Sequence, residues 1–125
     1  MNRLFFQCDD FLVVTNNELV SSKFSCVFVQ GSPVDVMRKA VEMTGSGYGF
    51  YSHPIAGDIR LLRNPSRTFV LKRASGEKNL KWDYKLEHSL RELENTLFDS
   101  ETSASEDYAT IDFDMFISLW KEDAV

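Results

Sequence analysis

The stretch that most constrains the fold is residues 80–123, in which an acidic run separates two amphipathic segments. From Trp82 onward, apolar residues recur at steps of three and four, a spacing that places them on one face of a helix. These residues are Trp82, Leu86, Leu90, Leu93 and Leu97. With Asn79 as the N-cap, the predicted helix reaches Phe98 and is about 28 Å long at about 1.5 Å per residue. Its apolar face must be buried against the rest of the chain.

The acidic run, residues 99–110, contains four carboxylates and few apolar side chains, so we expect a solvated loop. After it, apolar residues at helical spacing predict a second helix over residues 111–121, with Asp112 as its cap. The same residues alternate strictly, which would also fit a strand. We prefer the helix because a strand would expose Trp120 to water.

The first half of the chain is typical of strands joined by turns. Segments 4–8, 11–15 and 24–29 are rich in aromatic and β-branched residues and are separated by turn residues, as expected for an antiparallel meander. Residues 58–63 and 67–73 predict a hairpin around an Asn-Pro-Ser turn.

One short helix interrupts these strands. Ser32 is its expected N-cap, Pro33 its first residue and Asp35 its capping-box acid, and Gly45 is expected to end it. The predicted fold class is therefore α+β: a mainly antiparallel sheet of about five strands with one short helix, one long helix and a C-terminal helix. All of it should form a single domain over residues 1–125.

Charge is distributed unevenly along the chain, whose formal net charge is −5. Residues 1–75 hold nine basic and six acidic residues, whereas residues 76–125 hold five basic and thirteen acidic ones. An acidic end of this kind attracts a basic partner and repels nucleic acid. The basic hairpin beside Phe50 and Tyr51 would fit nucleic acid, but neutralisation by the chain's own acids is the simpler explanation. No apolar run approaches the length of a membrane span, so we expect a cytoplasmic protein.

Patterns that would predict catalysis, a cofactor or a metal are missing from the sequence. His53 and His88 lie far apart, and neither forms a local nucleophile signature with Cys26. The cysteines and histidines lack zinc-site spacing, and the acidic run lacks the calcium ligands of an EF-hand. Glycine-rich residues 45–49 follow a helix, so we expect a flexible connection instead of a phosphate loop. Cys8 and Cys26 are expected to be reduced core residues, and the protein is expected not to be an enzyme.

Size, acidity and the C-terminal segment Ile-Asp-Phe-Asp-Met-Phe-Ile-Ser-Leu-Trp, residues 111–120, resemble small acidic bacterial immunity proteins of the contact-dependent inhibition type. The resemblance implies a cytoplasmic inhibitor that neutralises a toxin domain, expected to be a nuclease, by covering its basic surface. The predicted partner-binding residues are Asp99, Glu101, Glu106, Asp107, Tyr108, Asp112 and Asp114. Tyr108 would be the aromatic anchor within the acidic rim.

Two other kinds of binding protein fit the same profile. A secretion chaperone is also small and acidic, but the opening strands differ from the usual first helix, and a dimer in solution would favour it. A phage-type nucleic-acid mimic would use the same acidic surface to block a DNA-processing complex. For the preferred hypothesis we expect a monomer and a basic protein partner, with no nucleic acid and no membrane.

Overall fold

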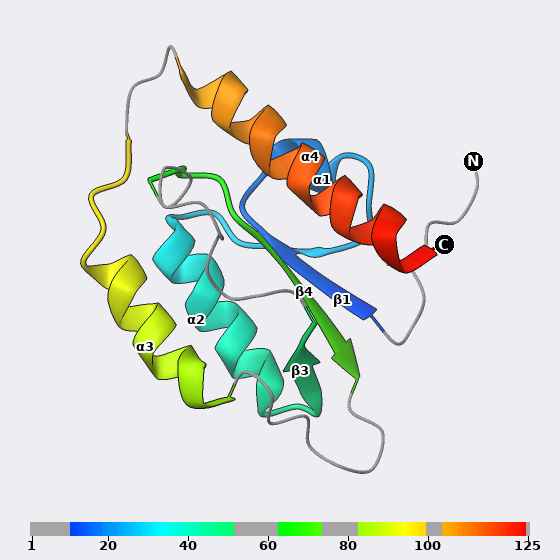
Figure 1. The fold of residues 1–125 in the computed structure, drawn as a ribbon, viewed down its shortest axis with the longest axis vertical. Helices are drawn as coiled ribbons and strands as arrows, with labels where there is room; N and C mark the ends of the chain where they lie inside the picture. Colours follow the sequence, from blue (N-terminus) through cyan, green and yellow to red (C-terminus); the bar gives the residue numbers. More distant parts are fainter. Residues whose placement is uncertain (1–10, 52–62, 74–82, 100–103, 125) are drawn as a thin grey trace.

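Strands β1 (Phe11–Thr15) and β4 (Thr68–Arg73) form the centre of a four-stranded sheet with the order β2-β1-β4-β3 (Figure 1). The computed structural model describes residues 11–51, 63–73, 83–99 and 104–124. Strand β2 (Val27–Phe28) runs parallel to β1, whereas β1 and β3 (Tyr48–Phe50) pair with β4 in antiparallel fashion. The α+β class is confirmed, but the sheet is mixed.

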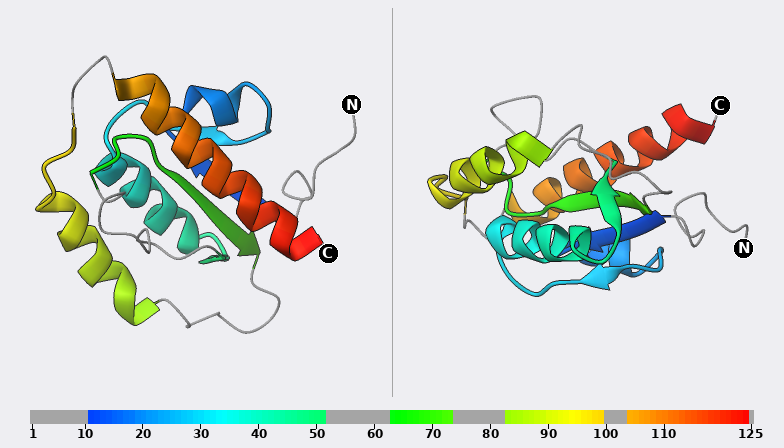
Figure 2. Two further views of the ribbon diagram at one scale, coloured as in Figure 1. Left: turned by 45° about the horizontal axis from the view of Figure 1, so that its top comes forward. Right: turned by 90° about the horizontal axis from the view of Figure 1, so that it is seen from below.

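Helices cover both faces of this sheet (Figures 1 and 2). Helices α2 (Pro33–Thr44) and α3 (Asp83–Glu94) lie side by side on one face. The short helix α1 (Glu18–Ser21) and the long helix α4 (Ser105–Ala124) cover the other face, and α4 runs along β1 and β4.

The central strands are apolar on both sides because each side faces helices. Successive side chains of a strand point to opposite faces, so Val13 and Val70 pack under α1 and α4, whereas Val14 and Phe69 pack under α2 and α3. Strands buried on both faces read as continuous apolar runs, which explains the Phe-Leu-Val-Val sequence of β1.

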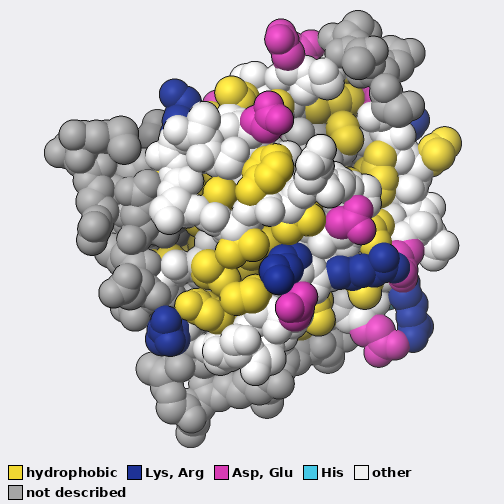
Figure 3. Space-filling model, turned by 180° about the vertical axis from the view of Figure 1, so that it is seen from behind, with side chains coloured by type: hydrophobic (Ala, Val, Ile, Leu, Met, Phe, Trp, Pro, Cys, Tyr) yellow, Lys and Arg dark blue, Asp and Glu magenta, His cyan; other side chains and the backbone are white. Residues whose placement is uncertain are grey.

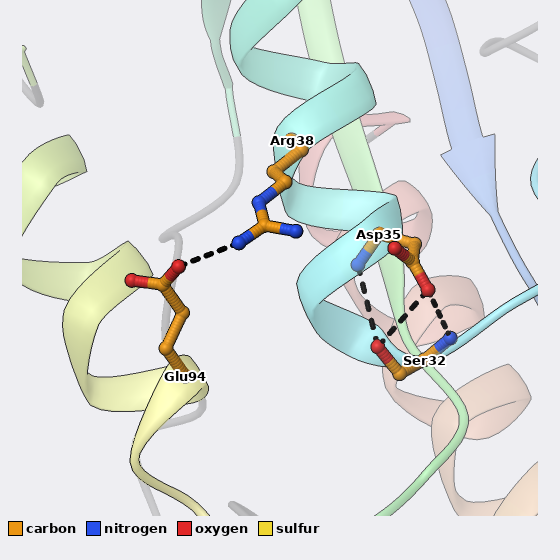
Figure 4. A network of polar contacts seen from close by, with 4 residues as sticks. All are labelled: Ser32, Asp35, Arg38 and Glu94. Carbon is orange, nitrogen blue, oxygen red and sulfur yellow. Dashed lines mark hydrogen bonds and ion pairs between the residues drawn. The ribbon is translucent and has the colours of Figure 1, made fainter.

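The predicted start of α2 is confirmed (Figure 4). Asp35 Oδ2 accepts a hydrogen bond of 2.9 Å from the backbone N–H of Ser32, and Ser32 Oγ accepts one of 3.4 Å from the backbone N–H of Asp35. Gly45 caps the C-terminal end, as expected. Arg38 then joins α2 to α3 through an ion pair of 2.6 Å with Glu94.

The predicted antiparallel meander is wrong. The expected strand 24–29 forms pairs only at Val27 and Phe28, and these run parallel to β1. The reason is α1, a helix absent from the prediction. It lies between β1 and β2, so the connection is a crossover instead of a tight turn, and the two strands run in the same direction. The expected strand 4–8 and residues 58–62 of the hairpin lie outside the described residues. Within residues 45–49, Tyr48 begins β3, so part of this expected connection belongs to a strand.

Both predicted C-terminal helices exist with different ends. Helix α3 stops at Glu94, four residues before Phe98, and Leu97 beyond it is 80% exposed. Helix α4 begins at Ser105, inside the expected acidic loop. Asp112 is therefore in the body of α4 and not at its cap. Asn79 and Trp82 lie outside the described residues.

None of the helices in the described part of the chain combines the length and apolar character that crossing a bilayer requires.

Candidate functional site

A cluster of buried polar residues lies where β1 ends, β4 begins and the first half of α4 crosses the sheet. We call it the Asp112 cluster, and its members are Thr15, Asn17, Asn64, Arg67, Thr68 and Asp112. All except the half-buried Thr68 are buried, with 7% or less of the residue exposed. Buried polar groups of this kind need hydrogen-bond partners, because desolvation without a partner is costly.

Asp112 is the centre of the cluster. Its Oδ2 atom accepts a hydrogen bond of 3.0 Å from Asn17 Nδ2 and lies 2.7 Å from Thr68 Oγ1. Thr68 Oγ1 in turn lies 2.7 Å from Thr15 Oγ1, which donates to the carbonyl oxygen of Arg67 over 3.0 Å. A continuous polar chain thus runs from α4 to the two central strands.

Thr68 Oγ1 donates the hydrogen bond to Asp112 Oδ2. Burial raises the pKa of Asp112 above its ordinary value of 3.8, against the opposing effects of the hydrogen bonds from Asn17 and Thr68 and of the charge on Arg67. Burial likewise lowers the pKa of Arg67, and Asp112 opposes that shift.

Two asparagine side chains hold the backbone of α4 beside Asp112. Asn17 Nδ2 donates to the carbonyl oxygen of Ala109 over 2.9 Å, and Asn64 Nδ2 donates to that of Tyr108 over 3.0 Å. Asn17 is also the N-cap of α1, where its Oδ1 accepts from the N–H of Leu19. The cluster therefore fixes the position of α4 relative to both central strands and α1.

The opposite side of α4 forms an exposed acidic surface. We call it the α4 outer face and define it by the exposed acids Glu106, Asp107 and Asp114. Ile111 and Met115 lie one helical turn apart beside it, and they are 37% and 43% exposed. Acidic groups next to exposed apolar side chains are suited to contact with a partner that is basic and partly apolar.

The predicted partner-binding residues separate into two groups. Glu106, Asp107 and Asp114 are exposed, whereas Asp112 is buried on the side of α4 that faces the sheet. Each residue of an α-helix is rotated by about 100° from the one before it, so acids close together in the sequence can lie on different sides of the helix. Its assignment to an acidic surface is therefore wrong.

The expected aromatic anchor has an internal partner. Tyr108 is half-buried, and its hydroxyl donates a hydrogen bond of 2.8 Å to Asp99 Oδ2. This bond directs both side chains towards each other at the start of α4. Glu101 lies outside the described residues.

The remaining candidate groups are dispersed. Cys26 is a half-buried free thiol, and burial raises its pKa, which disfavours the reactive thiolate. His88 is exposed and lines a surface hollow of about 470 Å³ with Arg91, Glu92, Asn95 and Thr96. No three His, Cys, Asp or Glu residues of the described segments are grouped as metal ligands. His53 and Cys8 lie outside those segments.

The members of the Asp112 cluster other than Asp112 were not predicted as site residues. Asn17 and Asn64 each belong to a sequence that is typical of a turn, and Arg67 and Thr68 to a predicted strand. Only the pairing of β1 with β4, which places Thr15 opposite Thr68, brings them together. Local sequence patterns contain no signal for such a contact.

Comparison with protein-family models finds a match to a family described as GrdX-like protein, over residues 12–121. This finding contradicts the resemblance to bacterial immunity proteins, which is therefore wrong. It depended on size, acidity and the texture of one helix, properties that unrelated small proteins share. Comparisons with curated proteins and with solved structures find no match.

Proposed function

The chain belongs to the GrdX-like protein family, and we propose that it is a non-enzymatic binding protein whose α4 outer face contacts a basic surface on a protein partner. The observation that supports this proposal most directly is the sorting of acids along α4. Glu106, Asp107 and Asp114 are exposed, whereas Asp112 is buried among polar partners. Glu106 and Asp107 lie in the first turn of α4, where acids stabilise the helix, but like Asp114 they remain exposed and are available to a partner.

The distribution of charge over the molecule is consistent with a localised acidic surface. Figure 3 shows the molecule from behind, relative to the view of Figure 1. On this face, basic side chains (Lys and Arg) and acidic side chains (Asp and Glu) are interspersed among hydrophobic ones. On α2 the opposite charges form pairs, as in Lys39 with Glu42 at 3.4 Å and Arg38 with Glu94 at 2.6 Å. Paired charges attract a partner weakly, whereas an acidic row steers a basic partner towards it.

A binding role also suits the chemistry of the titratable groups. A nucleophilic cysteine needs a lowered pKa, and that of Cys26 is raised. A raised pKa, as Asp112 has, would suit a general acid. The contacts of its carboxyl group, however, are with buried side chains of the fold. We infer that this carboxyl serves to hold α4 in place.

The proposal predicts which variants lose the partner. A tagged full chain should capture a basic protein from its native host at low salt, and the amount captured should fall at high salt because exposed charges are screened. Replacing Glu106 and Asp114 with lysine should reduce affinity by about tenfold or more, since like charges repel across an interface. Affinity is measured by titration of the purified partner.

The matched control replaces two exposed acids on other helices, Glu42 and Glu92, with lysine and makes the same change in net charge. Affinity that falls equally in both variants would indicate a general charge effect and would refute the α4 outer face as the site. Capture of a DNA-processing complex that DNA displaces would favour a nucleic-acid mimic instead. Capture of a secreted protein by a dimer of this chain would favour a chaperone.

A further inference from the structure

The two faces of the sheet are packed to different degrees. On the side of α2 and α3, eight residues form a buried core, and neither they nor the hydrophobic residues packed against them include any residue of α4. On the side of α4, Phe116 is buried, at 4% exposure, and the partly buried Phe113, Ile117 and Leu119 pack against the same cluster. The described apolar side chains on the two faces of the sheet therefore form separate clusters.

Among the described residues, polar contacts add to the apolar packing of α4, and they are concentrated in its first half. The amides of Asn17 and Asn64 donate to the carbonyl oxygens of Ala109 and Tyr108, and the Asp112 carboxyl lies among Asn17, Thr68 and Arg67. All of these contacts reach to other elements of the fold. Losing one partner of a buried hydrogen bond costs more free energy than losing an exposed hydrogen bond. Hydrogen bonds within one buried network also strengthen one another, so we expect these contacts to form and break together.

We propose that α4 can separate from the sheet as one unit while the core under α2 and α3 stays formed, and that the Asp112 cluster is the latch that keeps α4 closed. Opening exposes Val13, Val70 and Phe24, whose cluster includes Phe116 of α4, and leaves Val14, Met37 and Leu93 covered. Proteins open locally in cooperative units whose free energies lie below that of global unfolding. This inference does not depend on the proposed partner.

Native-state hydrogen exchange of the full chain tests the proposal. The amides of residues 109–119 should exchange as a group and faster than those of α2 at Met37 and Ala40. In the Leu93→Ala variant, α2 amides should exchange at least about thirtyfold faster, because a buried leucine is lost from the core that stays closed. The α4 amides should keep their wild-type rates, because Leu93 stays packed when α4 is open.

A second variant tests the latch. Asp112→Ala should accelerate the α4 amides by about tenfold or more, because Asn17 and Thr68 lose the buried carboxyl that accepts from both, and Asp112→Asn should have a smaller effect. If Leu93→Ala accelerates the α4 and α2 amides equally, α4 opens only with the whole molecule and the proposal fails. If both Asp112 variants leave the α4 amides unchanged, the latch is elsewhere and that part is wrong.

Discussion

At the scale of single residues, Gly31 shows how one missing side chain permits a helix start. A Cβ atom at this position would lie 2.4 Å from Asp35 Oδ2 and 3.0 Å from Asp35 Cβ. The Asp35 carboxylate could then not accept its hydrogen bond from the Ser32 N–H. Glycine here is required by close approach to a neighbouring side chain.

We therefore expect Gly31→Ala to lower the free energy of unfolding by about 1 kcal/mol, the usual cost of a lost helix cap. Urea denaturation measures this change. In an Asp35→Ala background the same substitution should cost less, because only the Cβ contact remains. Equal costs in both backgrounds would show that the capping box is not the cause.

At the scale of elements, α3 shows that an apolar stripe in the sequence can extend beyond the end of the helix that it predicts. Leu93 and Leu97 belong to the same predicted stripe, but Leu93 is fully buried and Leu97 is 80% exposed. The helix ends between them, at Glu94, and the chain then turns towards Arg63, whose carbonyl accepts from the N–H of Asp99 over 3.0 Å. The stripe predicts the helix correctly and its end incorrectly.

The two leucines provide a matched pair for mutation. Leu93→Ala should lower the free energy of unfolding by about 2 to 5 kcal/mol, as for other buried leucines. The same substitution at Leu97 should change it by less than about 0.5 kcal/mol. Thermal or urea unfolding of both variants measures the difference, and similar losses at the two positions would mean that Leu97 is covered in solution.

At the scale of the whole molecule, the Asp112 cluster joins both central strands, α1 and α4, so its protonation state affects global stability. The folded pKa of Asp112 is above its unfolded value, which means that the folded protein holds the proton more tightly. The stability that this proton contributes is fully present below the unfolded pKa and is lost as pH rises through the folded pKa.

Asp112→Asn is the uncharged counterpart, since an amide oxygen in the place of Oδ2 can accept from both Asn17 and Thr68. We expect wild type and Asp112→Asn to have similar stability near about pH 4, and the wild type to become the less stable of the two as pH rises. The slope of this difference cannot exceed about 1.4 kcal/mol per pH unit for one proton. Urea unfolding of both proteins across this range measures it. A difference that stays constant, or that grows in favour of the wild type, would show that Asp112 is ionised beside Arg67 throughout.

Local patterns were sufficient for the elements whose stability is local. The capping box at Ser32, the strand at residues 11–15 and the existence of both C-terminal helices follow from hydrogen bonds and periodicity within a few residues. The α+β class follows from those elements together.

Strand direction and the burial of Asp112 depended on contacts between distant segments. Four residues of α1 decide that β2 runs parallel to β1, and a helix so short has little periodicity to recognise. Asp112 has the same chemistry as Asp114, and sequence alone assigns both to the surface. Asp112 can be buried because Asn17, Thr68 and Arg67 offset the cost of its desolvation. These partners come from segments more than forty positions away in the chain. Composition and periodicity by themselves determined most of the elements, whereas the tertiary structure alone decided which acid on α4 is buried and which acids are exposed.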